Sequence, residues 1–485
     1  MKKILGGITL ILILWATTTV VIGTKTKDEL EKIVEKTNKI YTQQGVKIEI
    51  EEYQNSFFTA VATVKIDMLD SELKNAISKE YGLMFPIKAE YQIEHGPLFF
   101  KNGVALGLSR IYQEIEVSSL FNKEVQGSFT KKSMLTSKTV VSFSKVATYH
   151  LLGEGIEIKE GAKKLNIAPF EISGKSSLEN FTGEMQMVMP LISFVEDDKK
   201  VTIESMLLDI NMDKLVSNSL AMGTIDLIMK RFYLADKENG AIEVIPTLHI
   251  LSQKDGEKTF SSIMELNMDV NNSSTQSSFS DIEKLSLMLK VDGIGIKGMH
   301  EYQEAMTKAQ EKQTKIIIEL QKNPNNKEKN YQKLVSLKEE MASHLFNALK
   351  DMLFKDKSSI TYSFKSKTKD KKESHGDILL AYTGDIDFTK TAQEIRQSIN
   401  TNMFGLFKLE VDIAIAESHI QTLPDGDKFL KQLQAPMSQT MVNHRNNYYT
   451  IKGYLKNQEL ILNDENLTNT VLPLLKMLSQ LGMAE

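Results

Sequence analysis

The sequence predicts an α+β fold: an extended, mostly antiparallel β-sheet with capping helices and an inserted helical hairpin, preceded by one N-terminal transmembrane helix. Three observations predict it: a long uncharged run at the N-terminus, apolar residues that alternate with a period of two over most of the chain, and one segment with a helical period. The expected organisation is an anchor at 1–25, a β-rich region at 26–297, the helical hairpin at 298–356, and a C-terminal β-rich region with a terminal helix at 357–485.

The N-terminal run is the predicted membrane anchor. Lys2 and Lys3 precede residues 4–24, which carry no charged side chain and match the roughly 20 apolar residues that cross a bilayer. The alternative is a cleavable signal peptide, whose apolar core is about 7 to 15 residues long and ends in a small-x-small site. Because Ala16 is the only alanine of the run and is followed by three threonines, the sequence favours an uncleaved anchor.

The charges around the anchor predict its orientation. Lys2 and Lys3 precede the span and Lys25 and Lys27 follow it, so the difference in positive charge between its two sides is small. An N-in, C-out topology is still favoured. In a bacterium, residues 4–24 would then lie in the inner membrane and the bulk of the chain in the periplasm.

Composition excludes several classes of protein. The chain has 0 Cys, which excludes disulfides, thiolate metal sites and a cysteine nucleophile. With 59 Lys+Arg against 63 Asp+Glu, nothing indicates the clustered cationic surface that binds nucleic acid. A hydrophobic content of 41% is enough for true cores, so we expect most of the chain to fold.

Alternation predicts the strands of the sheet. A short helix at 28–44 comes first and ends at Gly45. Polar turns such as 197–200 and 254–257 separate the strands, which is typical of antiparallel hairpins. The predicted strands are 46–51, 61–68, 87–93, 140–149, 184–189, 201–212, 360–364, 378–388 and 407–416.

Two apolar stripes with helical spacing predict the helical hairpin, with 323–326 as its connection. One interpretation is a coiled-coil arm for a partner, and the other is two helices packed on the sheet. The second is favoured because the stripes are narrow and the outer faces are rich in Gln, Lys and Glu. The remaining predicted elements are a helix at 429–443, a closing hairpin at 448–462 and an amphipathic terminal helix at 471–481.

No motif predicts catalysis, a cofactor or a metal. Gly293, Gly295 and Gly298 form a G-x-G-x-x-G string, but helical sequence rather than a second parallel strand follows it. We therefore interpret the string as a strand-to-helix corner. The eight histidines stand singly, without metal-ligand spacing, at 95, 150, 249, 300, 344, 375, 419 and 444. The prediction is a protein that is not an enzyme and has no catalytic, cofactor-binding or metal-binding residues.

The string His95-Gly96-Pro97 ends a predicted strand. Pro97 cannot donate to the strand ladder and Gly96 permits an unusual turn, so the string is interpreted as a strand terminator. A histidine at such a corner is alternatively a ligand or recognition group, although the sequence offers no second residue to complete a site.

Four features are shared with a known family. They are the Lys-Lys and apolar span at the N-terminus, the early helix before a strand pair, the His95-Gly96-Pro97 corner, and the string YLKNQELILN at 454–463. In these features the chain resembles the YdgA-like family of bacterial proteins, a domain of unknown function. It departs from the family pattern at Asn457-Gln458 and Asp464, where glycines are usual. The resemblance implies an inner-membrane-anchored, periplasm-facing protein without established catalytic residues.

Two functional hypotheses follow. The first is a non-enzymatic envelope protein whose sheet acts as a scaffold or partner-binding surface for other envelope proteins. The second is a carrier that shelters acyl chains of lipids in an apolar groove, suggested by the apolar stretches 185–194 and 282–291 and by the 23 Met. A carrier requires an apolar surface that is open to solvent, whereas a sheet covered by helices on both faces excludes it.

Overall fold

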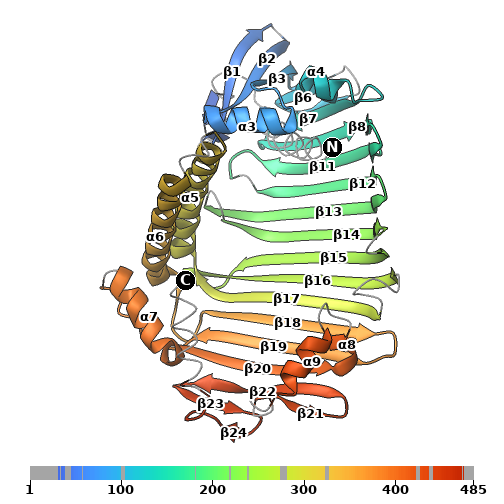
Figure 1. Cartoon of the computed structure of the whole chain (residues 1–485). Coiled ribbons are helices and arrows are strands. Elements are labelled where there is room, and N and C mark those ends of the chain that lie inside the picture. The colour runs from blue at the N-terminus through green and yellow to red at the C-terminus, as the bar shows by residue number, and fades with distance from the viewer. Residues whose placement is uncertain are drawn as a thin grey trace. The chain divides into compact units, whose positions relative to one another are not determined.

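The computed structural model forms two compact units, which we call the first unit (Met1–Lys230 and Met306–Lys338) and the second unit (Arg231–Ala305 and Glu339–Glu485). Each unit is described by itself, with the element labels of Figure 1. The structure describes residues 31–473 with gaps at 33, 36, 39–44, 57, 100–103, 181, 218–219, 238–239, 274–280, 323–326, 391, 422–425, 436–437, 439–440 and 472.

The first unit is built on an antiparallel sheet in which consecutive strands are mostly neighbours. Its strands pair in the order β1 (Val46–Asn55), β2 (Thr59–Met68), β3 (Ile87–His95), β6 (Ser109–Glu116), β7 (Met134–Val141), β8 (Val146–Gly153), β11 (Phe170–Ser177), β12 (Gly183–Glu196) and β13 (Lys199–Ser217). The hairpin of β9 (Ile156–Glu160) and β10 (Lys163–Ile167) also pairs with β12. A two-stranded sheet, β4 (Leu98–Phe99) and β5 (Ala105–Leu106), completes this set.

Apolar and polar residues alternate along these strands, and the apolar ones form the main core of the first unit. In β3, Ile87, Ala89, Tyr91 and Ile93 are buried and the residues between them are exposed. The buried set continues across the sheet and joins residues of the segments between strands, which include α3 (Ser71–Tyr81), the 3-10 helix η2 (Val117–Leu120) and α4 (Lys123–Gln126). One side of this sheet is therefore a closed apolar core.

The free edge of β1 is occupied by a side chain from the N-terminal helical residues. The Asn38 amide donates to the carbonyl of Ile48 at 2.8 Å, and its oxygen accepts from the Ile48 backbone N–H at 2.9 Å. Asn38 thus gives Ile48 the two hydrogen bonds that a further strand would give it.

A charge pair between fully buried Arg110 and partly buried Glu94 lies on the other side of the first unit's sheet. The Arg110 guanidinium donates to Glu94 Oε2 from Nε at 2.9 Å and from a terminal nitrogen at 2.6 Å. The guanidinium also lies over the rings of Phe99 and Tyr112, 5.1 and 5.4 Å from their centroids. These contacts replace the water that a buried cation loses.

The strands of the second unit also form antiparallel pairs. Its strands pair in the order β15 (Gly240–Lys254), β16 (Thr259–Ser273), β17 (Ile282–Gly295), β18 (Ser359–Thr368), β19 (Glu373–Tyr382), β20 (Phe407–Ala416), β22 (Tyr448–Lys456), β23 (Glu459–Leu462) and β24 (Glu465–Asn466). Strand β21 (Asn443–Arg445) also pairs with β22. The helices are α7 (Ala392–Leu406), α8 (Glu417–Gln421) and α9 (Gly426–Leu433).

Three elements have residues in both units, because the chain passes from one unit to the other within them. They are β14 (Leu220–Asp236), α5 (Ile296–Lys322) and α6 (Lys327–Met352). The two helices lie where the apolar stripes predict a hairpin. The G-x-G-x-x-G string is the predicted strand-to-helix corner, because β17 ends at Gly295 and α5 begins at the next residue. A Cβ at Gly295 would stand 1.7 Å from the Asp351 carbonyl oxygen, so this glycine lets the corner pack against α6.

Three glycines of the sheets each face an aromatic residue on the neighbouring strand. The pairs are Gly376 with Phe364, Gly174 with Tyr149, and Gly153 with Phe170. In each pair the ring covers the glycine, so that a Cβ there would lie less than 3.0 Å from ring atoms. The aromatic side chain supplies the packing that the glycine lacks.

The α+β class and the mostly antiparallel sheet are confirmed. Three predicted elements differ from the structure. The strand at 140–149 is two strands, because 142–145 forms a turn in which Val146 N–H donates to the Ser142 hydroxyl. The strand at 378–388 ends at Tyr382, after which the N–H groups of residues 383 and 384 both donate to the Leu406 carbonyl. The helix at 429–443 is α9, which ends at Leu433 before Pro436 in the sequence.

Three predicted elements lie wholly or mostly outside the described residues: the anchor at 4–24, the helix at 28–44 and the terminal helix at 471–481. Within the part of the chain that the structure describes, none of the helices combines the length and apolar character that a bilayer crossing needs.

We predict that Glu94→Ala strongly destabilises the first unit. It would leave the Arg110 cation buried without its carboxylate, and breaking such a pair costs about 3–5 kcal/mol. Urea unfolding of the full chain, followed by circular dichroism, measures the loss. Glu116→Ala is the matched control, because Glu116 pairs with the exposed Lys132 at 3.2 Å, and it should change stability by less than about 1 kcal/mol. Equal effects of the two substitutions would contradict the prediction.

We also predict that Gly376→Val destabilises the second unit by about 1–3 kcal/mol through overpacking. The added Cβ would meet a Phe364 ring carbon at 2.1 Å. Combining it with Phe364→Leu should restore part of the loss, as measured by the same unfolding assay. Gly127→Ala serves as control, since its nearest new contacts are 3.5 and 3.6 Å away. Failure of the double variant to recover would refute the steric explanation.

Candidate ligand-binding face

The second unit's sheet carries an unbroken apolar surface on one face. Residues directly opposite each other on paired strands point to the same face, so the registers show which side chains adjoin. The surface extends over β15 to β20, and we call it the apolar face: Leu248, Ile250, Met264, Leu266, Met268, Leu285, Leu287, Leu289, Val291, Ile360, Tyr362, Phe364, Ile378, Leu380, Leu409, Val411 and Ile413.

Two adjacent rows of this face cross all six strands. The registers that join them are continuous from β15 to β20, with no bulge inside either row. The first row is Leu248, Leu266, Leu287, Phe364, Gly376 and Ile413, and the second is Ile250, Met264, Leu289, Tyr362, Ile378 and Val411.

The opposite face of the same strands is mostly polar, although Leu251, Ile263 and Leu379 also lie on it. It bears ion pairs such as Lys290 with Asp292 at 2.7 Å and Lys284 with Asp269 at 3.4 Å. Its rows also contain amide, hydroxyl and imidazole groups: Thr247, Asn267, Ser286, Lys365 and His375 in one, and His249, Glu265, Met288, Ser363, Asp377 and Asp412 in the next. The ordinary solvent-facing side of an antiparallel sheet has this composition.

Unlike the core of the first unit, the apolar face is accessible to solvent. None of its side chains falls in the buried class, and Ile360 is 43% exposed. In the first unit, by contrast, Tyr91 and Val64 on the apolar side of β3 and β2 are fully buried. A solvent-exposed apolar surface of this extent marks a binding surface in soluble domains.

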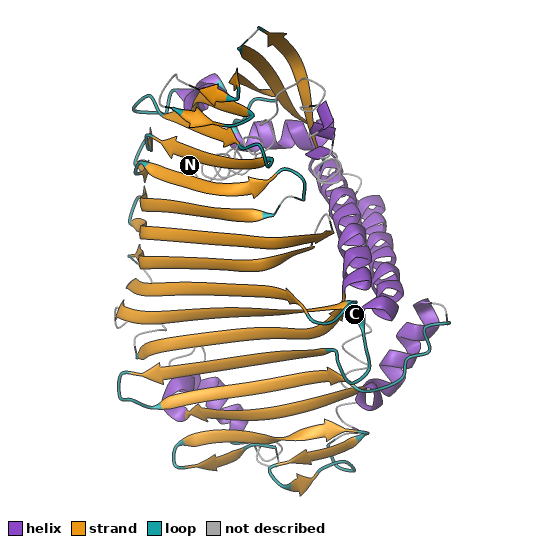
Figure 2. Ribbon diagram, turned by 180° about the vertical axis from the view of Figure 1, so that it is seen from behind, coloured by secondary structure: helices purple, strands orange, loops and turns teal. Residues whose placement is uncertain are grey.

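Helices α8 and α9 cover one margin of the face, as Figures 1 and 2 show from opposite sides. Ile420 and Leu430 of these helices form a buried cluster with Tyr449 of β22. Between α8 and the sheet, the Ser374 hydroxyl is hydrogen-bonded to His419 Nδ1 and accepts from the Ala416 backbone N–H. The strands from β15 to β18 stay uncovered by these helices in both views.

The face offers a ligand almost no polar contact. At its far end the hydroxyls of Ser252 and Ser262 bond to each other at 2.9 Å. Tyr382, at the other end, has a pKa that burial raises, and its hydroxyl accepts the Ile386 N–H at 3.0 Å. Such a surface binds hydrocarbon through contact area and has little means of recognising a charged group.

Among the described residues, Ser374 and His419 are paired as a nucleophile and its base would be, but Ser374 is buried beneath α8. In the described part of the chain, no three His, Asp or Glu side chains are grouped as metal ligands. Individual histidines have local roles instead: His150 contacts Glu171 at 2.7 Å, and His444 stacks on Tyr449.

The His95-Gly96-Pro97 string ends β3. The Gly96–Pro97 bond is cis, and His95 Nε2 lies 3.1 Å from Asn55 Oδ1. A Cβ at Gly96 would stand 1.7 Å from the Gly107 carbonyl oxygen, so two chain segments meet closely at this corner. The interpretation of the string as a strand terminator agrees with the end of β3.

Sequence reasoning identified part of the apolar face. The stretch 282–291 contributes Leu285, Leu287, Leu289 and Val291. The contributions of β18 to β20 could not be read from the sequence, because the place of β18 beside β17 depends on pairings across more than 60 residues of chain. The sequence signal that could have found them is the alternation of apolar residues with a period of two in each of these strands.

Comparisons with known proteins assign a family but no activity. The family model described as "Bacterial protein of unknown function (DUF945)" matches residues 1–469. Its description does not mention the YdgA-like proteins, so that narrower resemblance stays a prediction. No curated protein and no solved structure matches the chain significantly.

We predict that acid loosens α8 and α9. Burial lowers the pKa of His419 from 6.5, so the unfolded segment binds the proton more tightly than the folded one. The stability from neutral His419 is complete well above pH 6.5 and is lost as the pH falls below that value. The backbone amides of α8 and α9 should lose protection against hydrogen exchange as the pH falls from about 7.5 to about 5.5. The measured rates are first corrected for the intrinsic effect of pH on exchange.

The matched variants are His419→Asn, which should abolish this loss of protection, and His344→Asn on exposed α6, which should leave it unchanged. A pH dependence that survives in His419→Asn would show that another group is responsible.

Proposed function

The chain belongs to the DUF945 family of bacterial proteins of unknown function, and we propose that it is a non-enzymatic, membrane-anchored cell-envelope protein that binds acyl chains of lipids on the apolar face. Residues 4–24 would anchor it in the inner membrane with its bulk in the periplasm. The observation that carries the proposal is the solvent-accessible apolar face, which lies opposite a polar face on the same six strands.

Chemistry favours hydrocarbon as the ligand. Burying one methylene contributes about 0.8 kcal/mol, so a chain of many methylenes gains substantial binding energy without any hydrogen bond. A polar ligand would instead lose its hydrogen bonds to water on a surface that offers it almost no hydrogen-bond donors or acceptors. Side chains such as Met264, Met268 and Tyr362 adapt to a ligand of irregular shape.

The dimensions also suit an acyl chain. Six strands about 4.8 Å apart span about 24 Å across the sheet. Lipid chains fill half of a hydrocarbon core about 30 Å thick, so one chain can lie across these strands. The second hypothesis is a scaffold that binds another envelope protein. It predicts that a peptide, and not a lipid, occupies the same surface, and crosslinking distinguishes the two.

The test uses the full-length chain in cells fed a fatty acid with a photoreactive diazirine, which enters their lipids. After irradiation, mass spectrometry of the purified protein maps the crosslinked residues. We expect crosslinks on β16 and β17 in addition to residues 4–24. Crosslinks confined to residues 4–24 would refute acyl binding, and their absence at 4–24 would refute the anchor.

Adjacent residues of β17 provide the matched pair of variants. Leu287→Glu puts a carboxylate on the apolar face, whereas Ser286→Glu puts the same group on the polar face. Burying a carboxylate under hydrocarbon costs more than the 1.4 kcal/mol that corresponds to tenfold binding. Crosslinking on β16 and β17 should therefore fall at least about tenfold in Leu287→Glu and persist in Ser286→Glu.

A further inference from the structure

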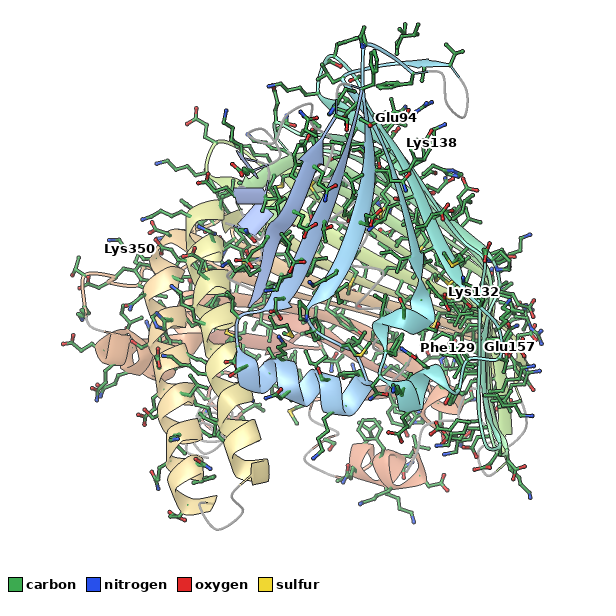
Figure 3. All side chains as sticks on the ribbon, turned by 90° about the horizontal axis from the view of Figure 1, so that it is seen from above. Glu94, Phe129, Lys132, Lys138, Glu157 and Lys350 are labelled. Atoms are coloured by element: carbon green, nitrogen blue, oxygen red, sulfur yellow. The ribbon has the colours of Figure 1, made fainter. Side chains whose placement is uncertain are left out.

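Three turns meet at one end of the first unit's sheet. Their described residues are 56 and 58 between β1 and β2, 96–99 and 104–107 between β3 and β6, and 142–145 between β7 and β8. We call them the tip turns. Figure 3 labels Glu94 close to this end, just where the strands reach their turns.

Backbone hydrogen bonds join these turns into one structure. The His95 N–H donates to the Phe58 carbonyl at 2.8 Å, which ties the first turn to the start of the second. The Leu108 N–H donates to the Val141 carbonyl at 2.7 Å, which ties the end of the second turn to the third. The three turns therefore present a single surface.

That surface exposes large apolar side chains. Val104 is 75% and Phe58 is 70% exposed, and Leu98, Leu106 and Phe143 are exposed as well. A single exposed apolar residue is normal on a protein, but five on three joined turns form a patch that marks an interaction site.

The patch rests on a rigid base. Phe99, between Leu98 and the rest of the second turn, is buried, and its ring lies over Arg110. Arg110 is in turn fixed by its double hydrogen bond to Glu94. The exposed side chains are thus held outward by an ordered structure and do not fold back into the core.

The charges of the tip turns fit an anionic surface. None of the described residues of the tip turns is Asp or Glu, whereas Lys145 belongs to them. Lys145 pairs with Glu179, in the loop between β11 and β12, at 3.4 Å. Aromatic and aliphatic side chains flanked by lysine and hydroxyl groups are typical of segments that enter the headgroup region of a bilayer.

The chain connection brings this patch within reach of the membrane. Glu31 lines the same surface hollow as Glu51 of β1, four residues before that strand ends at Asn55. Only residues 25–30 separate Glu31 from the apolar run at 4–24. Six residues reach at most about 20 Å, and the four of β1 span about 13 Å, so the linker is short enough to keep the tip within reach of the bilayer that residues 4–24 would span.

We propose that the tip turns insert their apolar side chains into the bilayer that residues 4–24 span, which gives the first unit a second contact with the membrane. This proposal rests on the membrane anchoring of the proposed function. The partner is a lipid surface with anionic headgroups, and a protein occupant of the same patch would overturn it.

The absence of native cysteine makes a direct test possible, because a single introduced cysteine can be spin-labelled without background. The full-length chain is reconstituted in vesicles of phosphatidylethanolamine and phosphatidylglycerol. Power-saturation electron paramagnetic resonance then compares collisions with oxygen, which concentrates in lipid, and with a water-soluble nickel chelate. Labels are placed by Phe58→Cys, Leu106→Cys and Phe143→Cys.

Two further labels serve as references. Leu14→Cys lies within the proposed span, and Tyr331→Cys replaces a side chain on α6 that is 62% exposed and so matches the tip residues in accessibility. We expect the oxygen-to-nickel collision ratio at the three tip labels to be several-fold above that at Tyr331→Cys, and to fall in vesicles of phosphatidylcholine alone.

Each outcome has a defined meaning. A low ratio at the tip with a high ratio at Leu14→Cys overturns insertion of the tip and leaves the anchor intact. A low ratio at Leu14→Cys overturns the anchor on which the proposal depends. Tip labels that both reagents fail to reach indicate a protein interface and also overturn it. Circular dichroism of each variant confirms that the sheet has formed.

Discussion

The second unit depends on one constraint, the register between its antiparallel strands. Because side chains alternate with a period of two, a one-residue slip of any strand would move its leucines to the polar side and its lysines and aspartates to the apolar side. The pairing of Leu266 with Leu287 and of Leu287 with Phe364 is the register that keeps these apolar side chains together on one face. Ion pairs on the polar face, such as Lys284 with Asp269, favour the same alignment.

The same alternation leads to different results in the two units. In the first, segments between strands close over the apolar side, and Leu83 and Phe121 join Tyr91 in its buried core. In the second, short α8 and α9 cover only a margin, so the strands from β15 to β18 keep their apolar side chains in contact with water. Two connections of the second unit, 255–258 and 369–372, are short turns that leave the adjoining strands uncovered.

The sequence alone predicted the elements whose signal is local. Strand β20 and the hairpin of β22 and β23 agree with it, because their alternation is regular and their turns are marked. It failed where a short polar turn interrupts an apolar run, as at 142–145. It could not place β18 beside β17, since a helical hairpin separates them in the chain, and so could not show that their apolar sides merge into one face. The Glu94–Arg110 pair was likewise invisible, because its two strands are joined through the long turn at 96–107.

The double hydrogen bond between Asn38 and Ile48 also concerns how copies of this protein meet. An open edge strand is a template on which a second chain can continue the sheet, and repeated addition leads to fibrils. At Ile48 the outward N–H and carbonyl already have partners at 2.9 and 2.8 Å. A neighbouring molecule in a crowded compartment would have to displace Asn38 before it could extend the sheet there. One side chain from the N-terminal segment thus helps to keep each copy separate.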